Sequence, residues 1–554
     1  MAHTIGFLTN ARGLVAGGWN RCLPVLVLAV CAVGLSGDDR GRDLSPRYPW
    51  VDGKPPGSVR PVPPYPPVVV QRPPALSARS AQIPDDYSRE RLLAGHLLRH
   101  IGFGPNPQDL RDVLTMGRDA YVERQLDPHS INDAKAESKL PPKGHDFYDD
   151  YSWLRRWYTR MTYTRRQLLE KMVLILHEHF ATSNEKVSSG CYMHEQEEFF
   201  RKNALGNFRD LLVGITKDQA MLIWLDNDWN DGQAYDDDGN KIPPNENYAR
   251  ELMQLFSLGT AKLNMDGTPV VDSDGVPVPA YTEDDVKAAA RALTGWHVTY
   301  GKCGKKAGFE KWTHDEENKT FLGQVIKGRK GKAGTQEVAD VVRIIMQQSS
   351  VAPFISKMLI QKLATETPTP GYVERVATVF KQSGGDLKKT VRAILMDDEL
   401  YSDEIIRAEY KEPIEQFVGA LRALGAVTRG GAPIDWTYTS GQLVYYPPSV
   451  FSFYPPGSKA TLVNTALVTI RDRVAEDIVN GYWDTYFLSE KHIKGHKLKT
   501  PEQAVDYLAD LLLTAPLQDE VRDIVITYMN GQVTDEKFRG AVWLILCSPD
   551  FQVN

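Results

Sequence analysis

The sequence predicts a mainly α-helical protein: a large multi-helical body with a small β-hairpin insertion, preceded by a signal segment and a Pro-rich linker. Two observations predict this class. Apolar residues recur at helical spacing from about residue 88 onward, and the alternation that is typical of strands is scarce. With 554 residues, 42% of them hydrophobic and 25% charged, the chain has the size and composition of a globular protein.

Residues 1–36 are predicted to be a signal peptide. Arg12 and Arg21 precede an apolar run at 22–34, which is too short to span a bilayer comfortably and has the length of a signal-peptide core. Small residues near its end offer cleavage sites, and a lipoprotein anchored through Cys31 is the alternative. The chain is therefore expected to be exported, whether to the periplasm, the cell surface or the medium.

Residues 37–84 are predicted to be a linker, because their many prolines remove backbone donors and fix φ. No later segment approaches a membrane-spanning apolar run, so the mature chain is expected to have no transmembrane span. We divide the remainder into an N-terminal helical part with the candidate site, 85–345, and a C-terminal helical part, 346–554.

Charge and cysteine content exclude some classes of protein. A net charge of -6 argues against nucleic-acid binding, which needs a basic surface. Five cysteines in 554 residues do not make a disulfide scaffold. In an oxidising compartment Cys191 could pair with Cys303, with Cys547 left over.

The helices of the first part are predicted from apolar periodicity and from cap residues. A long helix carries the apolar residues between 153 and 176 and ends in the polar segment 177–184. Two helices follow at 245–259 and 281–296, and the Asp-Gly turns between them predict the hairpin insertion. The other predicted helices lie at 87–100, 107–116, 118–126, 193–203, 204–215 and 220–225, and further helices resume after 338.

His177 and His179 are the predicted metal ligands. Residues two apart on a continuous helix point about 200° apart, so both imidazoles can bind one ion only if the helix ends there. Zinc sites on helices normally use histidines four residues apart, and this pair does not. In the alternative interpretation, one histidine packs in the core and the other caps the helix or faces solvent.

The candidate catalytic residues are Arg250, Glu251, Asp285 and His314. Arg250 and Glu251 lie in the middle of the first central helix, where a buried charge network indicates either a site or a framework. Asp285 lies in the first turn after Thr282, and the alternative interpretation is that it serves only the helix start. His314 begins a polar loop, and loops on a rigid frame often carry function. We expect these residues to line one pocket with the 177–184 segment.

Several motifs occur in an order that resembles the bacterial family catalogued as domain of unknown function 1800, over about residues 88–554. The motifs are His96–Arg99 with Gly102–Gly104, His177–Ser183, Ala204–Leu211, Asn245–Gly259, Tyr281–Trp296, His314–Gly323, Ser383–Asp386, Gln442–Val450 and Ser548–Phe551. One departure is Ser452-Phe453, where the family usually has Gly-Trp. The resemblance implies an exported or envelope-associated helical protein without an established reaction. Members are often encoded beside secreted sulfatase-like proteins, which implies work on extracellular polymers.

Two functions follow as hypotheses. The first is a metal-assisted hydrolase acting on an extracellular polymer. His177, His179 and His314 would be ligands of a divalent metal or proton carriers, Glu251 the general base or a ligand, and Arg250 an anion clamp. The second is a non-enzymatic envelope or matrix scaffold that binds an extracellular glycan or a secreted sulfatase-like protein.

Overall fold

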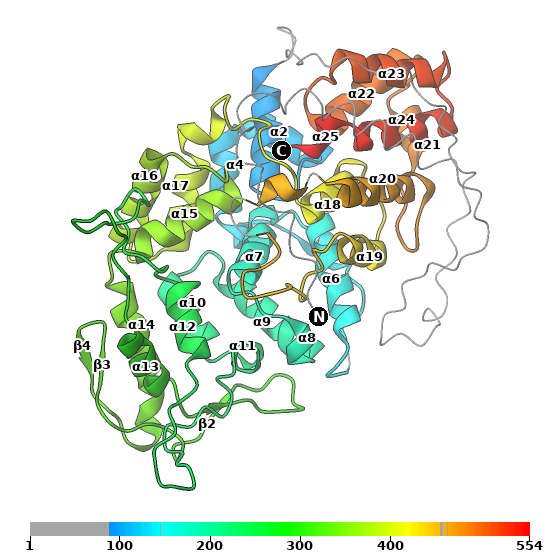
Figure 1. The fold of residues 1–554 in the computed structure, drawn as a ribbon. Coiled ribbons are helices and arrows are strands. Elements are labelled where there is room, and N and C mark those ends of the chain that lie inside the picture. The colour runs from blue at the N-terminus through cyan, green and yellow to red at the C-terminus, as the bar shows by residue number, and fades with distance from the viewer. Residues whose placement is uncertain (1–87, 145, 455–457, 463) are drawn as a thin grey trace, which may run out of the picture.

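The computed structural model describes residues 88–144, 146–454, 458–462 and 464–554 (Figure 1). The predicted signal peptide and linker lie outside these residues. The described chain contains 24 α-helices and two small antiparallel sheets of two strands each. The mainly α class predicted from apolar periodicity is therefore confirmed.

The first helices follow their predicted boundaries closely. Asn106 caps the helix that begins at Pro107, accepting hydrogen bonds from the N–H groups of Gln108 and Asp109 at 2.9 Å each. Proline suits this first helical position because its N–H would have no intrahelical partner. The helices are α2 (Arg89–His100), α3 (Pro107–Met116), α4 (Arg118–Gln125), α5 (Ala134–Glu137), α6 (Asp150–Tyr163) and α7 (Gln167–His179), with a 3-10 turn at Pro128–Ser130.

The prediction of a single long helix through residues 153–176 is wrong, because the helix is interrupted between α6 and α7. The carboxylate of Asp133 accepts hydrogen bonds from the Thr164 hydroxyl at 2.5 Å and from the Arg165 N–H at 2.8 Å. Thr164 has extended backbone angles and its hydroxyl accepts from the Arg166 N–H. A side chain distant in sequence thus holds the break open, and apolar spacing carries no signal for it.

The central helices are shorter than predicted. The helix predicted over 245–259 is α12 (Asn247–Gln254), with Glu246 as its N-cap residue. The predicted C-terminal half is not helical. The Phe256 N–H donates to the Glu251 carbonyl, five residues back, and Gly259 has a φ of 75°. The neighbouring helices are α8 (Asn184–Val187), α9 (Gly190–Asn203), α10 (Phe208–Ile215), α11 (Gln219–Trp224) and α13 (Glu283–Ala292).

The insertion between α12 and α13 consists of three short extended segments joined by two tight turns. The Val270 N–H donates to the Lys262 carbonyl at 2.8 Å, and the Val278 N–H donates to the Val270 carbonyl at 2.9 Å. Gly267 and Gly275, each with a φ of 79°, supply the left-handed positions of the turns. The pairing is made of isolated bridges and not of regular strands.

Two further hairpin-like pairs occupy the segment after α13, which the sequence indicated only as irregular. Strand β1 (Trp296–His297) pairs with β2 (Gly308–Phe309), and β3 (Lys319–Phe321) pairs with β4 (Gln324–Ile326). Strands of two or three residues are too short to show alternation, which explains why periodicity missed them.

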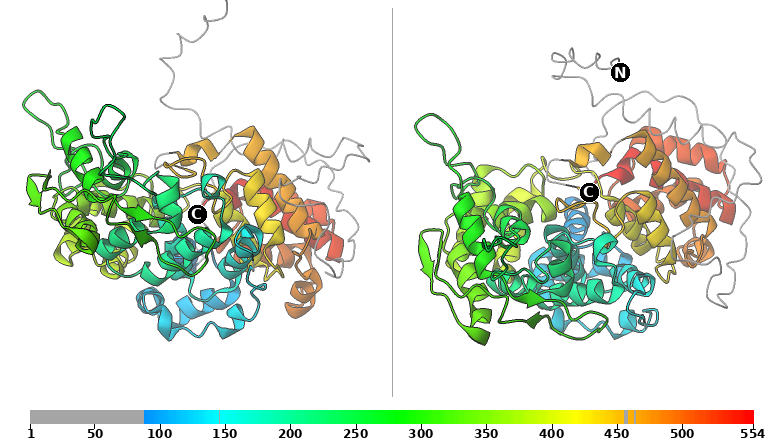
Figure 2. Two further views of the ribbon diagram at one scale, coloured as in Figure 1. Left: turned by 90° about the horizontal axis from the view of Figure 1, so that it is seen from below. Right: turned by 60° about the horizontal axis from the view of Figure 1, so that its bottom comes forward.

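The helices of the second half pack beside the first. They are α14 (Glu337–Met346), α15 (Val351–Leu363), α16 (Pro370–Gln382), α17 (Leu387–Leu395), α18 (Pro413–Ala423), α19 (Gly431–Thr439), α20 (Thr465–Asn480), α21 (Ser489–Gly495), α22 (Pro501–Leu513), α23 (Asp519–Met529), α24 (Asp535–Cys547) and α25 (Pro549–Gln552), with 3-10 turns at Gly331–Gln336, Asp398–Tyr401 and Lys459–Leu462. Figures 1 and 2 show α14–α17 and α20–α24 on opposite sides of α6 and α7.

Buried apolar side chains form two clusters. The larger one extends from Ala94 to Tyr445 and includes α14–α17. The smaller one joins α18, α20 and α22–α25 and reaches α2 only through Leu92. The larger cluster contains residues on both sides of position 346. The division of the chain between residues 345 and 346 stays a prediction.

Ser452 has a φ of 68°, the left-handed conformation that glycine adopts without strain. This is the position where the resembled family usually has glycine, and the Ser452 hydroxyl is buried without a partner among the described residues. We therefore expect Ser452→Gly to raise the free energy of unfolding by about 1 kcal/mol, measured by chemical denaturation. At Ser402, where φ is -74°, the same substitution should lower it. A destabilised Ser452→Gly protein would contradict the argument.

Candidate functional site

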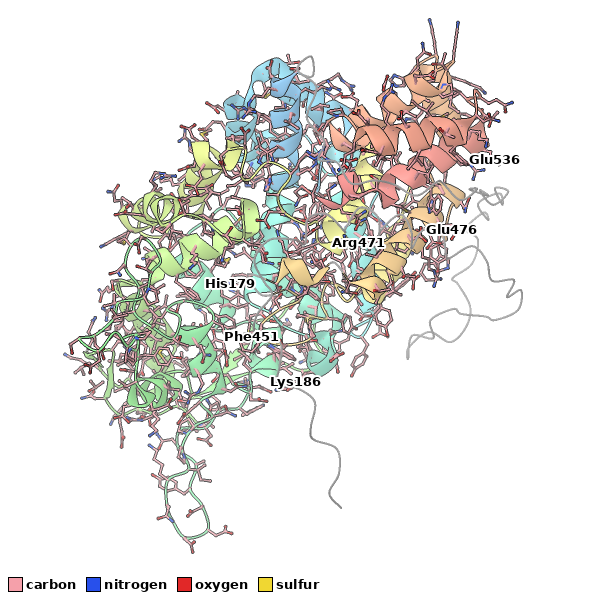
Figure 3. The ribbon with its side chains drawn as sticks, turned by 45° about the horizontal axis from the view of Figure 1, so that its top comes forward. His179, Lys186, Phe451, Arg471, Glu476 and Glu536 are labelled. Atoms are coloured by element: carbon pink, nitrogen blue, oxygen red, sulfur yellow. A yellow bond between two sulfur atoms is a disulfide. The ribbon has the colours of Figure 1, made fainter. Side chains whose placement is uncertain are left out.

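His177 and His179 contact different groups of residues. The Nε2 atom of His177 accepts a hydrogen bond from the Tyr445 N–H at 3.0 Å, and its ring lies 5.5 Å from that of Trp157. The Nε2 atom of His179 lies 3.1 Å from the Phe256 carbonyl, to which it donates. His179 lies toward the middle of the molecule in Figure 3. Burial lowers the pKa of each imidazole to about 4.

These contacts agree with the core interpretation of the pair. Each histidine has a nitrogen engaged by the backbone, and each packs against its own set of aromatic rings. Their joint role as metal ligands stays a prediction, and the contacts do not support it.

His314 lies in a third environment, a fully buried polar network. Its Nδ1 atom lies 3.1 Å from the Thr294 carbonyl, and its Nε2 atom lies 3.2 Å from Glu337 Oε1. Lys319 Nζ donates to Glu337 Oε2 at 2.8 Å, and both side chains are 0% exposed. Substrate cannot reach this histidine without an opening of the fold, so the geometry favours a structural role.

Arg291 connects the surface to this network through Asp315. It donates to both carboxylate oxygens of Asp315, at 2.9 and 3.0 Å, and to Glu317 at 2.9 Å. Although burial raises the pKa of Asp315, the hydrogen bonds from Arg291 and Lys241 lower it to about 2. Arg291 thus joins α13 to the loop that carries Asp315 and Glu317.

Asp285 serves the start of α13. Its Oδ2 atom accepts from the Thr282 N–H at 2.9 Å, and the Thr282 hydroxyl accepts in return from the Asp285 N–H. This reciprocal pair is a capping box. The Oδ1 atom accepts from the Leu322 N–H at 2.6 Å. Both carboxylate oxygens are therefore engaged in holding α13 and the β3–β4 hairpin.

Arg250 and Glu251 stay near the surface, at the α12–α13 junction. Arg250 donates to both oxygens of Glu283, at 2.7 and 2.8 Å, and to Glu246 at 3.1 Å. Glu251 is half-buried, and its Oε2 atom has no hydrogen-bond partner among the described residues. Burial raises the pKa of Glu251 although Arg250 opposes this. Of the predicted catalytic residues, Glu251 alone is half-buried with a carboxylate oxygen that no described residue engages, and this Oε2 atom is itself buried.

An exposed aromatic surface lies next to the start of α12. We call it the Trp229 surface and define it by Asp228, Trp229, His297 and Tyr300. Trp229 is 54% exposed and stacks on His297, with ring centroids 4.6 Å apart and planes inclined by 21°. Tyr300 is 59% exposed and donates its hydroxyl to Asp228 Oδ2 at 2.5 Å.

The backbone of Trp229 is held in an unfavourable conformation. Its φ is 55°, which costs a non-glycine residue roughly 1–3 kcal/mol. The Trp229 N–H donates to the Trp296 carbonyl at 3.0 Å, and Asp228 Oδ1 accepts from the Val298 N–H at 2.7 Å. A large apolar ring is thus fixed toward solvent by bonds on both sides, which is typical of a recognition surface.

A disulfide holds the loop that carries Tyr300. Cys191 of α9 is bonded to Cys303, as the cysteine count allowed, and Cys547 is buried. The Tyr192 hydroxyl donates to the Thr299 carbonyl at 2.7 Å, so α9 supports this loop at a second point.

The Trp229 surface is attached to α12. The Asn230 side chain donates to the Asn245 carbonyl at 2.9 Å and accepts from the Asn245 N–H at 2.8 Å. These paired bonds fix the 226–231 turn against the residues that precede α12. The aromatic surface and the carboxylate of Glu251 are therefore carried by one continuous frame.

A second acid-rich group lies on α9. Among the described residues, His194, Glu197 and Glu198 form the one group of three potential metal ligands whose atoms all lie within 4.8 Å of one another. Arg201 donates to Glu197 and Glu198 at 2.5 Å each, and Arg160 lies 3.7 Å from Glu197. Guanidinium groups already neutralise these carboxylates, so the group fits an ion-pair network and not a metal site.

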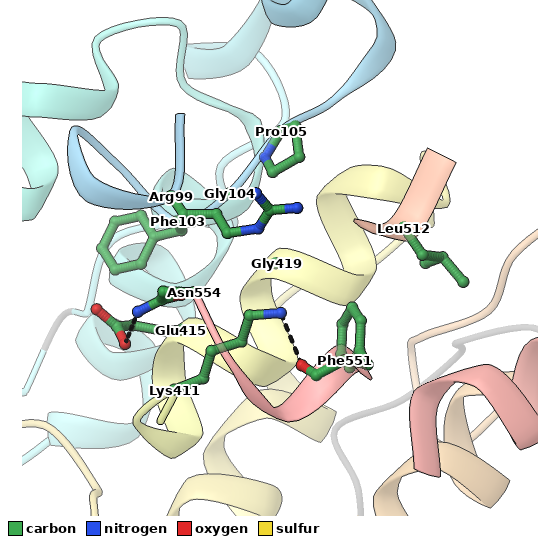
Figure 4. Close-up of a pocket in the computed structure, with 10 residues that line it drawn as sticks. All are labelled: Arg99, Phe103, Gly104, Pro105, Lys411, Glu415, Gly419, Leu512, Phe551 and Asn554. Atoms are coloured by element: carbon green, nitrogen blue, oxygen red, sulfur yellow. Dashed lines mark hydrogen bonds between the residues drawn. The ribbon is translucent and has the colours of Figure 1, made fainter. Parts of the chain in front are cut away.

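A small pocket lies between the two buried clusters (Figure 4). Lys411 points into it and donates to the Phe551 carbonyl at 2.7 Å, and Asn554 donates to Glu415 at 3.2 Å. Burial holds the pKa of Lys411 well below its usual range. The free space is about 10 Å³, room for about one water molecule, so the pocket is too small for a polymer.

Comparison with known families decides the membership of the chain. A family described as "Protein of unknown function (DUF1800)" matches residues 96–553. The chain belongs to this family. No curated protein and no solved structure matches the chain.

A motif of the family now has a structural place. The segment Gln442–Val450 lies against the end of α7, where Gln442 Nε2 donates to Glu178 Oε1 at 3.3 Å and the Tyr445 hydroxyl bonds to Glu197. Tyr445 has a φ of 71°, so this segment is held in a strained turn. The family motif thus builds the packing around His177.

Sequence reasoning missed two features of the described chain. The exposure of Trp229 follows from its backbone conformation, and no spacing rule reveals a positive φ in a tryptophan. His96 was noted only in the motif His96–Arg99, and His100 only as the last residue of the predicted helix 87–100. Their four-residue spacing on a helix was visible in the sequence.

Proposed function

We propose that this chain is an exported helical protein that binds an extracellular glycan through the Trp229 surface and acts without catalysis. The observation that carries the proposal is the exposed, conformationally fixed ring of Trp229 stacked on His297. An aromatic face flanked by polar groups suits the apolar face of a sugar ring and its hydroxyls. Asp228 and the Tyr300 hydroxyl supply the polar groups.

Export is part of the proposal and has independent support. The Cys191–Cys303 disulfide is the kind of bond that persists in oxidising compartments and is rare in the cytosol. No helix in the described ranges is long and apolar enough to cross a bilayer. Fractionation of producing cells, with thiol labelling of Cys191 and Cys303 before and after reduction, tests the export step.

The binding step predicts a selective loss in one variant. Trp229→Ala should weaken retardation by immobilised extracellular polysaccharide at least tenfold in affinity electrophoresis, because the stacking face is removed. The immobilised polysaccharides tested include uncharged and sulfated polymers. The polymers that retard the unmodified chain identify the class of glycan that it binds.

Trp483→Ala is the matched control. Trp483 is 48% exposed, also has a positive φ of 52°, and stacks on Tyr482, yet it belongs to the segment beside α20. The control should bind like the unmodified chain. Equal binding by the unmodified chain and Trp229→Ala would refute the role of this surface.

A second candidate function rests on half-buried Glu251, whose buried Oε2 atom has no hydrogen-bond partner among the described residues. In this second hypothesis the chain hydrolyses the polymer that it binds. Glu251 is the general base, and Arg250 binds an anionic group of the substrate. A divalent metal and a secreted sulfatase-like partner stay proposals, and the separate contacts of His177 and His179, the predicted metal ligands, do not support a joint metal site.

The two functions make different predictions for Glu251→Gln. If the chain is a hydrolase, the release of reducing ends from a bound polysaccharide should fall at least a hundredfold, with binding retained. If it only binds, neither the unmodified chain nor Glu251→Gln releases reducing ends. Glu283→Gln is the control, because Glu283 is exposed and engaged by Arg250.

A further inference from the structure

A lysine-rich patch lies on α21 and on the turn that follows this helix. We call it the α21 patch and define it by the exposed residues Lys491, Lys494, Lys497 and Lys499. Four lysines within nine residues are a strong local charge in a chain whose formal net charge is -6. Short lysine-rich runs are typical of surfaces that bind acidic polymers.

The helix that carries the α21 patch is fixed to its neighbours. His492 Nε2 donates to the Leu424 carbonyl at 3.1 Å, so His492 Nδ1 accepts from the Tyr507 hydroxyl at 2.7 Å. The Ser489 hydroxyl donates to Asp535, which joins the start of α21 to that of α24. The backbone that presents the lysines is therefore ordered before a partner binds, which lowers the entropy cost of binding.

Most of this positive charge is not neutralised within the described chain. Lys494 pairs with Glu490 at 2.6 Å, and both side chains are exposed. No carboxylate of the described chain lies within 4.0 Å of the ammonium groups of Lys491, Lys497 or Lys499. Three of the four lysines therefore offer their whole charge to a partner.

Acidic side chains on the two helices that contact α21 are engaged elsewhere. Asp535 of α24 pairs with Arg539 at 3.1 Å, and Asp506 of α22 pairs with Arg522 at 3.0 Å. Glu502 accepts hydrogen bonds at the start of α22, and these lower its pKa. An excess of positive charge thus remains at this part of the surface.

Lys497 occupies a backbone position that favours glycine. Its φ is 52°, in the left-handed region, and the Leu498 N–H donates to the Ile493 carbonyl, five residues back, at 3.0 Å. This hydrogen bond ends α21 in the pattern that usually has glycine at the position of Lys497. A lysine there is strained where glycine would not be, which indicates that its charge serves a purpose other than stability.

The composition of the patch favours a polysaccharide over a membrane or a nucleic acid. Ile493 and Leu498 are half-buried and pack against the smaller core cluster, so the patch has no exposed apolar side chain to insert into a bilayer. Residues 489–500 contain no arginine and no Phe, Tyr or Trp, the side chains that bind phosphates and bases in nucleic-acid surfaces. The ammonium groups themselves suit carboxylate and sulfate groups.

We propose that the α21 patch is a second binding site, in which the four lysines bind the carboxylate or sulfate groups of an acidic polysaccharide. Figure 1 shows α21 on the opposite side of the molecule from β2, which pairs with the strand that carries His297. The α21 patch is therefore separate from the Trp229 surface, and its failure leaves the proposed function untouched.

The test measures binding of the full chain to immobilised dextran sulfate, polygalacturonate and uncharged dextran by surface plasmon resonance. Every measurement is repeated with Trp229→Ala, which lacks the other surface, so that only the α21 patch contributes. We expect this chain to bind an acidic polymer and not uncharged dextran. Because each bound lysine releases a counterion, the affinity should fall at least about tenfold between roughly 50 and 200 mM salt.

The combined substitutions Lys491→Gln, Lys497→Gln and Lys499→Gln should weaken binding to the acidic polymer at least about tenfold at roughly 50 mM salt, because three exposed ion pairs are lost. These side chains have no carboxylate partner in the described chain, so the fold should be unaffected. Circular dichroism and the denaturation midpoint check that it is.

The matched control combines Lys135→Gln, Lys381→Gln and Lys388→Gln. These lysines are also exposed and without a carboxylate partner in the described chain, but they lie on other helices. The control changes the net charge by the same amount and should bind like the unmodified chain. An equal loss in the control would show that only net charge matters, and it would overturn the proposal.

Lys497→Gly separates binding from stability. It should raise the denaturation midpoint, because glycine adopts the left-handed conformation without strain, and it should weaken binding about twofold to fivefold. Equal affinity of the unmodified chain and the triple α21 variant would overturn the proposal. Tighter binding to a DNA duplex or to acidic phospholipid vesicles than to either acidic polysaccharide would overturn it as well.

Discussion

Arg422→Met is expected to lower the free energy of unfolding by about 3–5 kcal/mol, the range for removing one partner of a buried ion pair. The side chains of Arg422 and Asp109 are 1% and 3% exposed, and Arg422 Nη2 donates to Asp109 at 2.5 Å. Arg422 also donates to the carbonyls of Gly104 and Thr162, at 3.2 and 2.9 Å. It therefore connects α18 to α3 and to the end of α6.

The measurement is the shift of the chemical denaturation midpoint of purified protein. Arg375, whose side chain is 53% exposed and paired with Asp397, gives the control, and Arg375→Met should cost no more than about 1 kcal/mol. Combining Arg422→Met with Asp109→Asn removes the unpaired carboxylate and should recover part of the loss. Equal losses for Arg422→Met and Arg375→Met would contradict the buried network.

His179→Gln is expected to make the chain less sensitive to acid. The folded pKa of His179 is about 4, against 6.5 for the unperturbed group, because burial disfavours the charged ring. The unfolded chain therefore binds more protons, and stability that is full above pH 6.5 is lost as pH falls toward 4. The histidine accounts for a loss of roughly 2 kcal/mol between pH 7 and pH 5.

The comparison uses denaturation of both proteins at pH 7 and pH 5. Other groups titrate in the same range, such as Asp218, whose pKa burial raises to about 7. They are common to both proteins and cancel in the difference. The amide of glutamine keeps a donor for the Phe256 carbonyl. The control is His129→Gln at an exposed position, and an identical pH dependence of His179→Gln and the unmodified chain would be inconsistent with a half-buried, neutral imidazole at position 179.

Periodicity was sufficient for the fold where helices have a continuous apolar face. α3 begins and ends at its predicted residues, and α2 lies within two residues of its prediction. It failed where a distant side chain decides the local structure. The break between α6 and α7 depends on Asp133, and the short α12 depends on wider backbone bonds after Gln254.

The candidate site was predictable only in part. The capping role of Asp285 was visible in its position three residues after Thr282 in the sequence, and the capping box in the structure agrees with that interpretation. The environments of His177, His179 and His314 depend on segments far away in sequence, such as Tyr445, Phe256 and Glu337. Glu251 stays a candidate because, among the predicted catalytic residues, it alone has a carboxylate oxygen without a hydrogen-bond partner in the described chain, although this atom is buried.

The most direct test of glycan binding is carbene footprinting of the chain with and without an oligosaccharide cut from a retained polymer. The account predicts protection of Trp229 and Tyr300 on addition of the oligosaccharide, with Trp483 labelled equally in both samples. Unchanged labelling of Trp229 and Tyr300 at saturating oligosaccharide, or protection confined to other surfaces, would contradict it.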